Sequence, residues 1–297
     1  MFYEYAIDPV ILSDLERCKA FFNGFQNKPH HLISDAPKNW SNYARQQIDA
    51  IPHELCKPVM KKTLKKHLKD LLDKNLIRNR IISSGLTNWD DFSAEEHQKY
   101  PFSAILGMTS KSKPVLSYEF DNLLFESPGC WHEQNQCHVD REASAIIDKI
   151  MPLLVISKQI HLVDRIFTFI RPKWGYYESL IKELIKRAPQ YNFGKGISVI
   201  NIHSSDKYGN LSDHANKNLL PILPEGITIN VYQWPFNTMH DRFIITDVGG
   251  VQIGHGLDEK TDNNAKQALM TALDNNTLKV ERRKISGEPI EKFSISK

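Results

Sequence analysis

The sequence has few cysteines and no long apolar run. Its cysteines are too few and too scattered for a disulfide framework in a chain of 297 residues: Cys18, Cys56, Cys130 and Cys137. No apolar stretch approaches the length needed to cross a bilayer. The first residues, MFYEYAIDPVILSDLERC, contain acids early and no basic region followed by an apolar run, which is not the pattern of a secretory signal. These absences predict a protein of the reducing cytoplasm.

A large charge of either sign is also missing. There are 38 Lys and Arg residues against 35 Asp and Glu residues, so the net charge is +3. This mildly basic balance permits a polyanionic partner without requiring one. Hydrophobic residues make up 41% and charged residues 25%, which is the composition of an ordinary globular protein and excludes a disordered or fibrous class. The length suits one large or two medium domains.

Residues 1–125 are rich in aromatic residues and interrupted apolar runs, which indicate a mixed, largely helical N-terminal region whose fold the pattern does not assign. One segment, Lys57–Arg80, has apolar residues at helical spacing. They are Met60, Leu64, Leu68, Leu71, Leu72 and Leu76. Nine Lys and Arg residues against two Asp residues make the other face of this helix basic. Such a face either attracts a phosphate backbone or is simply solvated.

From about residue 140 the pattern becomes regular. It predicts strands over 159–167, 196–203 and 226–234, and helices over 140–158, 176–188 and a short segment after residue 212. The first of these helices is expected to bend or end near Pro152. A hairpin, a helix over 264–275 and a last strand near 277–283 follow. Strands separated by helices predict an α/β domain over residues 140–297, with a sheet between helices.

The predicted hairpin, MHDRFIITDVGGVQIGHGLDE, contains a histidine and an arginine two positions apart. Residues two apart on a strand share a face, so His240 and Arg242 point the same way while Asp241 points opposite. An imidazole can attack phosphorus or transfer a proton, and a guanidinium can bind two non-bridging oxygens. Neither role requires a metal or a cofactor, and we predict none. The pair is therefore a candidate phosphate site.

The central glycines of the hairpin suggest its register. If Gly249-Gly250 is a two-residue turn, His255 lies opposite Ile244 and shares the face of the candidate pair. Asp247 has the other parity and precedes the turn, where its carboxylate is expected to cap backbone N–H groups or brace a neighbour. A one-residue bulge would change this register.

The spacing of His240, Arg242 and Asp247 is H-x-[K/R]-x4-D, and six further residues lead to Gly254. This spacing resembles the signature of the phospholipase D superfamily. The segments HDR, GG and IGHGLD resemble even more closely the matching segments of the phospholipase D-like C-terminal domain of MIT-domain proteins. Three positions depart from the superfamily pattern, because Arg242 stands where lysine is usual, His255 where serine or threonine is common, and Leu257 where asparagine is frequent.

The resemblance implies a metal-independent phosphodiesterase with His240, Arg242 and Asp247 as catalytic residues. Catalytic members combine two H-x-K elements, in which one histidine forms a phosphohistidine and the other protonates the leaving group. Small nucleases of the superfamily carry one element per chain and complete the site by homodimerisation. One element here implies a nuclease acting on DNA or RNA as a symmetric homodimer.

The MIT-associated branch implies an alternative. Its phospholipase D-like domain is a membrane-binding and partner-binding module. Since a fold does not by itself decide between chemistry and binding, the chain is alternatively a non-catalytic module for an anionic membrane, a nucleic acid or a protein partner.

Strand ends supply further candidates for substrate binding. Asp164 ends the first predicted strand of the domain and His203 ends the second, at positions where α/β sheets commonly present ligand-contacting groups. Together with His255 they are predicted substrate-binding residues. The alternative for Asp164 and His203 is an ordinary role in a strand-end turn.

The segment CWHEQNQCH holds four potential zinc ligands within nine residues: Cys130, His132, Cys137 and His138. Zinc fingers usually separate their ligand pairs more widely, so that a hairpin or helix folds between them. The pattern therefore favours a polar surface loop over a metal site.

Overall fold

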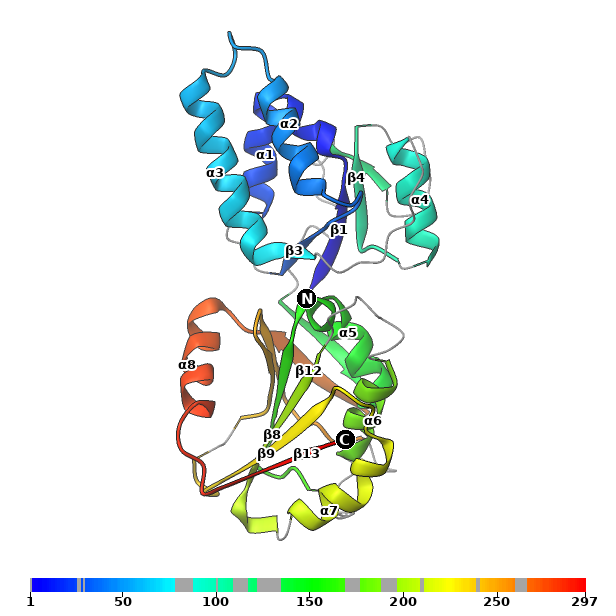
Figure 1. Cartoon of the computed structure of the whole chain (residues 1–297), viewed down its shortest axis with the longest axis vertical. Coiled ribbons are helices and arrows are strands. Elements are labelled where there is room, and N and C mark those ends of the chain that lie inside the picture. Colours follow the sequence, from blue (N-terminus) through cyan, green and yellow to red (C-terminus); the bar gives the residue numbers. More distant parts are fainter. Residues whose placement is uncertain are drawn as a thin grey trace. The chain divides into compact units, whose positions relative to one another are not determined.

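The computed structural model describes residues 2–25, 28, 30–77, 88–99, 101–108, 117–121, 135–168, 177–187, 197–208, 211–238, 241–259 and 266–297. The chain forms two compact units, Phe2–Glu133 and Gln134–Lys297 (Figure 1). Both units combine a sheet with helices, which confirms the predicted α/β class. Within the described ranges, no helix has both the length and the apolar character needed to cross a bilayer.

The first unit contains a five-stranded parallel sheet in the order β3-β2-β1-β4-β5. Its strands are β1 (Tyr3–Ile7), β2 (His31–Ser34), β3 (Leu76–Ile77), β4 (Ala104–Gly107) and β5 (Ser117–Glu119). Its helices are the 3₁₀ turn η1 (Pro9–Ser13), α1 (Leu15–Phe25), α2 (Trp40–Ala50), α3 (Pro58–Asn75) and α4 (Trp89–Lys99). The region is therefore mixed and largely helical, as predicted, although the pattern did not identify its individual strands. Every residue of β2 and β4 is buried, so these strands lack the polar alternation that would have revealed them.

Helices cover both faces of this first sheet. The apolar sides of α1, α2 and α3 pack with Tyr5 and Ile7 of β1, whereas Phe92 of α4 packs with Ala6 and Ile105 on the opposite face. The predicted helix within Lys57–Arg80 is present as α3. Its buried stripe begins at Leu64, because the Met60 side chain is 45% exposed.

The second unit is built on an eight-stranded mixed sheet in the order β13-β9-β8-β7-β10-β11-β12-β6. Its strands are β6 (Gln136–Asp140), β7 (Gln159–Val163), β8 (Val199–Ser205), β9 (Thr228–Trp234), β10 (Phe243–Thr246), β11 (Gly250–Ile253), β12 (Gln267–Ala272) and β13 (Glu291–Ser296). Strands β7, β8 and β9 are parallel to one another, and the remaining pairs are antiparallel.

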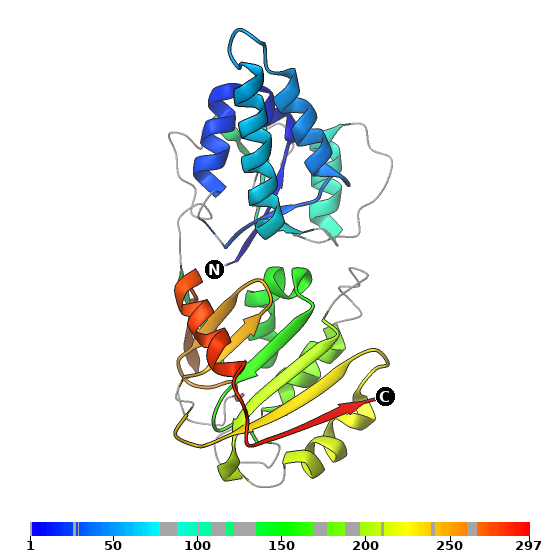
Figure 2. The same ribbon diagram turned by 60° about the vertical axis from the view of Figure 1, so that its left-hand side comes forward.

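Helices lie on both sides of the second sheet, as Figures 1 and 2 show. They are α5 (Ala143–Ile156), α6 (Glu178–Arg187), α7 (Leu211–Asn218) and α8 (Asn275–Ile285), with the short 3₁₀ turns η3 (Asp206–Tyr208) and η4 (Leu220–Ile222). The α8 helix packs through Leu278 and Ile285 onto Val163, Phe243 and Ile245. The other three helices cover the opposite face.

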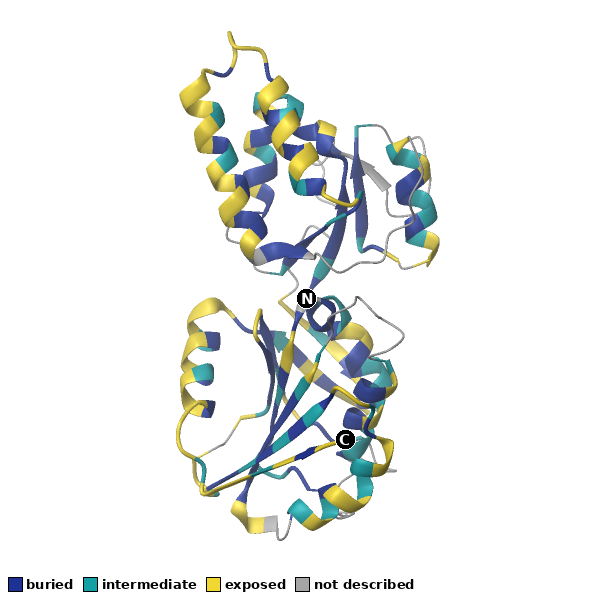
Figure 3. Ribbon diagram, in the orientation of Figure 1, coloured by how far each residue is buried: buried dark blue, intermediate teal, exposed yellow. Residues whose placement is uncertain are grey.

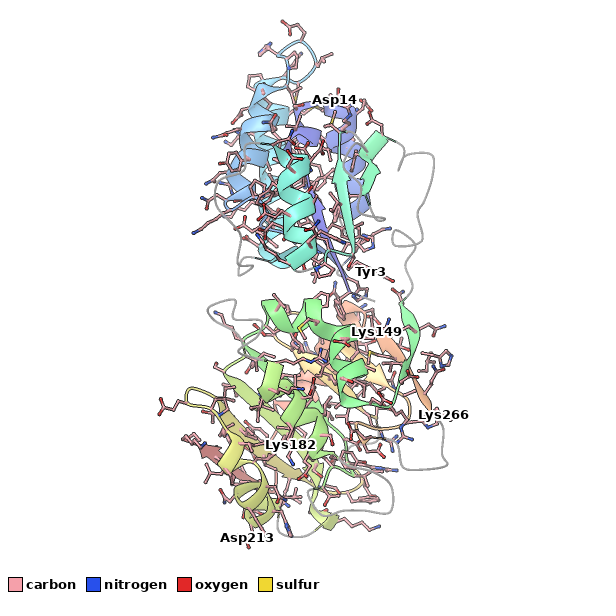
Figure 4. All side chains as sticks on the ribbon, turned by 90° about the vertical axis from the view of Figure 1, so that its right-hand side faces the viewer. Tyr3, Asp14, Lys149, Lys182, Asp213 and Lys266 are labelled. Atoms are coloured by element: carbon pink, nitrogen blue, oxygen red, sulfur yellow. The ribbon has the colours of Figure 1, made fainter. Side chains whose placement is uncertain are left out.

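Burial follows this layering. Figure 3 shows buried residues concentrated on the strands and on the inner sides of the helices. The outer sides are polar, and Figure 4 marks Lys149 of α5 and Lys182 of α6, both of which are exposed. The α5 helix continues through Pro152 to Ile156 and does not end at the proline.

Two elements near the C-terminus were predicted wrongly. The segment predicted as a helix over 264–275 contains the strand β12, and the strand predicted near 277–283 lies within α8. Alanine, leucine, methionine and glutamine favour a helix by intrinsic propensity, but pairing of β12 with β11 and β6 overrides this weak preference. In α8, the Asp274 side chain caps the first turn by accepting from the N–H groups of Asn276 and Thr277.

Candidate functional site

The hairpin of β10 and β11 has a register different from the predicted one. Ile244 pairs with Val251, and Ile245 pairs with Gly250. The turn consists of residues 247 and 248, and it is closed by a hydrogen bond of 2.7 Å from the Thr246 N–H to the Gly249 carbonyl oxygen. The Thr246 hydroxyl accepts the N–H groups of residues 248 and 249, each at 3.2 Å. The predicted Gly249-Gly250 turn is therefore wrong, because the threonine hydroxyl organises an earlier turn.

Gly250 instead permits close packing within β11. A Cβ atom at this position would lie 3.1 Å from both the Ile244 carbonyl oxygen and a methyl carbon of Leu273. The corrected register also moves His255. It lies in an exposed turn beyond β11 and is not opposite Ile244. The turn is nevertheless at the same end of the hairpin as Arg242, since the Ile253 N–H donates to the Arg242 carbonyl oxygen at 3.0 Å.

Arg242 lies at the edge of the sheet where the parallel strands end. Strands β7, β8 and β9 run in one direction, and β10 runs antiparallel to β7. Asp164 directly follows β7, so it meets Arg242, which directly precedes β10. Open α/β sheets bind ligands outside the carboxyl ends of their parallel strands. The predicted residues Asp164 and Arg242 are therefore brought together at the edge where a ligand is expected.

Asp164 is fully buried and supports the inner side of Arg242. The Arg242 Nε lies 3.5 Å from Asp164 Oδ2. The same carboxylate accepts the Ile166 N–H at 3.0 Å and the Leu257 N–H at 3.1 Å. Burial raises the pKa of Asp164, whereas the Ile166 N–H, the Arg242 charge and the Leu257 N–H lower it. Asp164 is thus placed to orient Arg242 rather than to reach a ligand in solvent.

The Arg242 side chain is partly exposed, at 23%. The ion pair recorded for it among the described residues is formed by its Nε atom. A guanidinium with both Nη groups available can bind two oxygens of one phosphate in parallel.

A second ion pair lies beneath this site. Arg141 Nη2 and Asp258 Oδ2 are 2.7 Å apart, and the two side chains are 8% and 5% exposed. Burial raises the pKa of Asp258, and the charges of Arg141 and Arg242 lower it. Two buried carboxylates and two guanidinium groups therefore meet at one point.

Gly256 makes this arrangement possible. Its φ angle is +106°, and a Cβ atom there would lie 2.7 Å from Asp258 Oδ1 and 3.2 Å from Asp164 Oδ2. Glycine alone accepts both the dihedral angle and the close approach. Sequence reasoning assigned no role to Gly256, Asp258 or Arg141. The first two lie inside the GHGLD letters of the resemblance, but Arg141 carries no motif, because only the pairing of β6 with β12 brings it to this edge.

Asp247 lies at the opposite end of β10. Its Oδ1 accepts the N–H groups of Lys158 at 2.9 Å and Gln159 at 3.5 Å, at the start of β7. This is the bracing role expected from its parity. Asp247 lies five residue steps along the strand from Arg242, which corresponds to about 17 Å. The structure does not bring the motif carboxylate to the motif arginine.

His203 belongs to a buried network on the other face of the sheet. Its Nδ1 accepts the Trp234 indole N–H at 3.1 Å, and its Nε2 lies 2.9 Å from His161 Nδ1. Burial, followed by the neighbouring His161, lowers its pKa well below the usual value. His203 pairs with Val163, which faces α8, so its imidazole points away from the Arg242 side. The structure therefore does not place His203 with the other candidates.

Several predicted residues lie outside the described part of the chain. They are His240, Cys130 and His132. Cys137 and His138 are consecutive on β6 and so project to opposite faces of the sheet. Across the described residues, no three His, Cys, Asp or Glu side chains are grouped to hold a metal ion.

Comparison with known proteins adds no family. No protein-family model matches the chain, and neither does any curated protein. Among solved structures, the chain is similar to TrmBL2, described as an archaeal chromatin protein whose structure shows a novel mode of DNA binding. The identity is 12%, over 91% of this chain and 97% of that one, with a TM-score of 0.27. A likeness at this score supports no conclusion about fold or function.

Proposed function

We propose that the Gln134–Lys297 unit is a metal-independent phosphodiesterase that cleaves DNA or RNA at the Arg242 edge. One observation carries the proposal. The Arg242 side chain is 23% exposed at the carboxyl edge of the parallel strands, and its Nε atom lies 3.5 Å from the buried Asp164 carboxylate. That geometry suits a phosphate diester, whose two non-bridging oxygens match the guanidinium fork.

The mechanism follows from this arrangement and from the resemblance. Arg242 binds the non-bridging oxygens and stabilises the negative charge that accumulates on them in the transition state. His240 attacks phosphorus, so that an N–P bond forms while the P–O bond to the leaving strand breaks. A second histidine protonates the leaving oxygen. Water then attacks the phosphohistidine, releases the phosphate end and returns the imidazole.

The second histidine is proposed to come from another copy of the chain. Each chain has one usable H-x-R element, and a two-fold dimer would bring two such elements together. Sedimentation tests this step. An active protein that sediments as a monomer at assay concentration would contradict it, whereas activity that rises with dimer fraction supports it.

The direct test is cleavage of labelled DNA and RNA oligonucleotides in excess EDTA. Loss of one preorganised charge-stabilising group costs about 10²–10³-fold in rate, so Arg242→Ala should lose that much, while Arg242→Lys should retain more. Arg283→Ala is the matched control, because Arg283 is an exposed arginine on α8 in the same unit. Cleavage abolished by EDTA, or unchanged in Arg242→Ala, would overturn the proposal.

A second candidate is binding without chemistry, and the position of Asp247 favours it. The motif carboxylate is occupied by backbone N–H groups at the far end of β10. In this case the unit binds an anionic lipid surface, a nucleic acid or an acidic protein partner through Arg242. This binding function predicts no turnover of any phosphodiester. Co-sedimentation with phosphatidylserine vesicles would then weaken in Arg242→Ala and not in Arg283→Ala.

A further inference from the structure

Three neighbouring strand ends place two cations around one aromatic ring. Arg165 follows β7, Lys207 follows β8 and Phe236 follows β9. The Arg165 Cζ lies 5.0 Å from the centroid of the Phe236 ring, and the Lys207 Nζ lies 4.5 Å from it. Cations at these distances are attracted by the ring quadrupole. The phenylalanine therefore gathers two positive charges at the edge that also bears Arg242.

Backbone hydrogen bonds hold the turns that contain Arg165 and Phe236, and Lys207 lies in the 3₁₀ turn η3. The Arg165 carbonyl oxygen accepts the Ser205 N–H at 3.3 Å and the Ser205 hydroxyl at 2.7 Å. Phe236 sits in a turn closed by the Thr238 N–H, which donates to the Pro235 carbonyl oxygen at 2.9 Å. The cations are consequently presented by ordered turns at the ends of adjacent parallel strands.

The two cations together favour a nearby anion. Because both lie close to one ring centroid, their charged groups are at most about 10 Å apart, a distance at which they repel one another in partly desolvated surroundings. Among the described residues, Asp206 and Asp241 are exposed acids close to the ends of β8 and β10. Asp206 precedes Lys207 in η3, whereas Asp241 points to the α8 side, where its Oδ1 lies 3.5 Å from Gln252 Nε2. Arg165 and Lys207 therefore add positive charge at the edge that bears Arg242.

The cations follow the edge in a row. The strand order places β8, β7 and β10 next to one another, so the row runs from Lys207 through Arg165 to Arg242. Adjacent strands are about 4.8 Å apart, which gives roughly 10 Å between the backbone positions at the two ends of the row. Flexible lysine and arginine side chains can adjust this distance to the spacing of consecutive phosphates. A ligand with a single phosphate would use only one end.

We propose that Arg165 and Lys207 form a second phosphate subsite, positioned by Phe236, for the phosphate that neighbours the one bound at Arg242. The ligand class is a nucleic acid strand with at least two consecutive phosphates. This inference rests on the proposed function of the Arg242 site and extends it from a phosphodiester to a polynucleotide. Phe236 is a positioning residue, because its ring contacts the two cations.

The test compares two substrates with the full-length protein in EDTA. One is a labelled single-stranded oligonucleotide, and the other is bis(p-nitrophenyl) phosphate, which has a single phosphodiester. Lys207→Ala and Arg165→Ala should each raise KM for the oligonucleotide several-fold with kcat nearly unchanged, since a flanking contact binds ground state and transition state alike. Neither should change kcat/KM for the small diester. Lys217→Ala, at an exposed lysine of α7, is the matched control.

Salt dependence gives a second, independent readout. Each lost phosphate contact should reduce the slope of log affinity against log salt concentration by about 1. Phe236→Leu keeps both charges but removes the ring, so it should raise KM while leaving the salt slope close to that of the wild type. A structural role alone would not separate KM from the salt slope in this way.

The outcomes distinguish this inference from the proposed function. If the wild type cleaves both substrates and the variants affect neither KM nor salt slope, the subsite is refuted while the phosphodiesterase stands. If the wild type cleaves neither substrate, the phosphodiesterase fails. Equilibrium binding of the labelled oligonucleotide then decides the subsite, which survives only if Lys207→Ala and Arg165→Ala each lower the salt slope.

Discussion

The carboxyl ends of the parallel strands carry acids in both units, and in the second unit an arginine lies beside one of them. In the first unit, Asp8 follows β1 and Asp35 follows β2. Their carboxylates accept backbone N–H groups, from Val10 at 2.9 Å and from Trp40 at 2.8 Å. In the second unit, Asp164 follows β7 and likewise accepts a backbone N–H, from Ile166 at 3.0 Å, but it also lies 3.5 Å from the partly exposed Arg242.

The comparison distinguishes side chains that satisfy backbone N–H groups from side chains that remain accessible to a ligand. A carboxylate that caps the turn after a strand stabilises the fold and does not need a ligand. A guanidinium cannot cap an N–H group, so an arginine at the same kind of edge satisfies no backbone donor there. The second edge is therefore where we expect an anionic ligand.

The largest effect expected from this comparison is at the buried ion pair of the second unit. Arg141→Met leaves the buried Asp258 carboxylate without its partner and should reduce the free energy of unfolding by about 3–5 kcal/mol. Urea unfolding, resolved by hydrogen exchange of peptides from β10 and β11, measures it. A loss below about 1 kcal/mol would show that water or Arg242 compensates the carboxylate.

The next effect is at Gly256. Gly256→Ala forces a side chain into a φ angle of +106° and against Asp258, and should cost about 1–3 kcal/mol. Gly254→Ala is the matched control in the same loop, since its Cβ would meet nothing closer than the Leu269 carbonyl oxygen at 3.6 Å. Equal stability of the two variants in urea would contradict the proposed close packing of the loop.

Buried histidines should make the second unit the more acid-sensitive one. Burial lowers the pKa of His31 in the first unit to about 4, and burial followed by Arg282 lowers that of His161 in the second to about 4. His203 adds a further lowered pKa in the second unit. A lowered folded-state pKa contributes stability above the unfolded value of 6.5 that is lost as the pH falls toward 4.

The measurement is the urea midpoint of each unit at several pH values between 7 and 4.5. Asp164 and Asp258 act in the opposite direction, because burial raises their pKa values. The histidine contribution is therefore taken as the difference between wild type and His161→Asn. If the stability of the second unit depends on pH in the same way in His161→Asn as in the wild type, the contribution of the buried histidine is refuted.

The smallest effect is expected at the exposed ion pair of the first unit. Arg17 and Asp121 are 2.6 Å apart, but their side chains are 27% and 51% exposed. Arg17→Met should change the free energy of unfolding by about 0–1 kcal/mol, because solvent screens the pair. A loss as large as that of Arg141→Met would break the distinction between the two units. Urea unfolding under identical conditions provides the comparison.

The sequence predicted the second fold better than the first. Long alternating or apolar runs identified the parallel strands β7, β8 and β9, whereas the fully buried four-residue strands of the first unit carry no such period. The last two elements were predicted wrongly because alanine and methionine in β12 have a helical propensity that strand pairing overrides. Local pattern alone could not anticipate that pairing.

The proximity of two candidate residues could be anticipated where the ends of adjacent strands determine the geometry. Arg242 and Asp164 were identified from strand parity and strand ends, and the structure brings them to 3.5 Å. The hairpin register failed because the Thr246 hydroxyl, and not the glycines, organises the turn. Arg141 reaches the site through pairing across the sheet, and no local motif encodes such a contact.

The central claim is tested most directly by the single-turnover rate of oligonucleotide cleavage in excess EDTA, measured for the wild type and for His240→Ala. We expect cleavage by the wild type that survives EDTA and is abolished in His240→Ala, with the urea midpoint unchanged. Equal rates for the two proteins, or no cleavage by the wild type at any enzyme concentration, would contradict phosphodiester chemistry at the Arg242 edge.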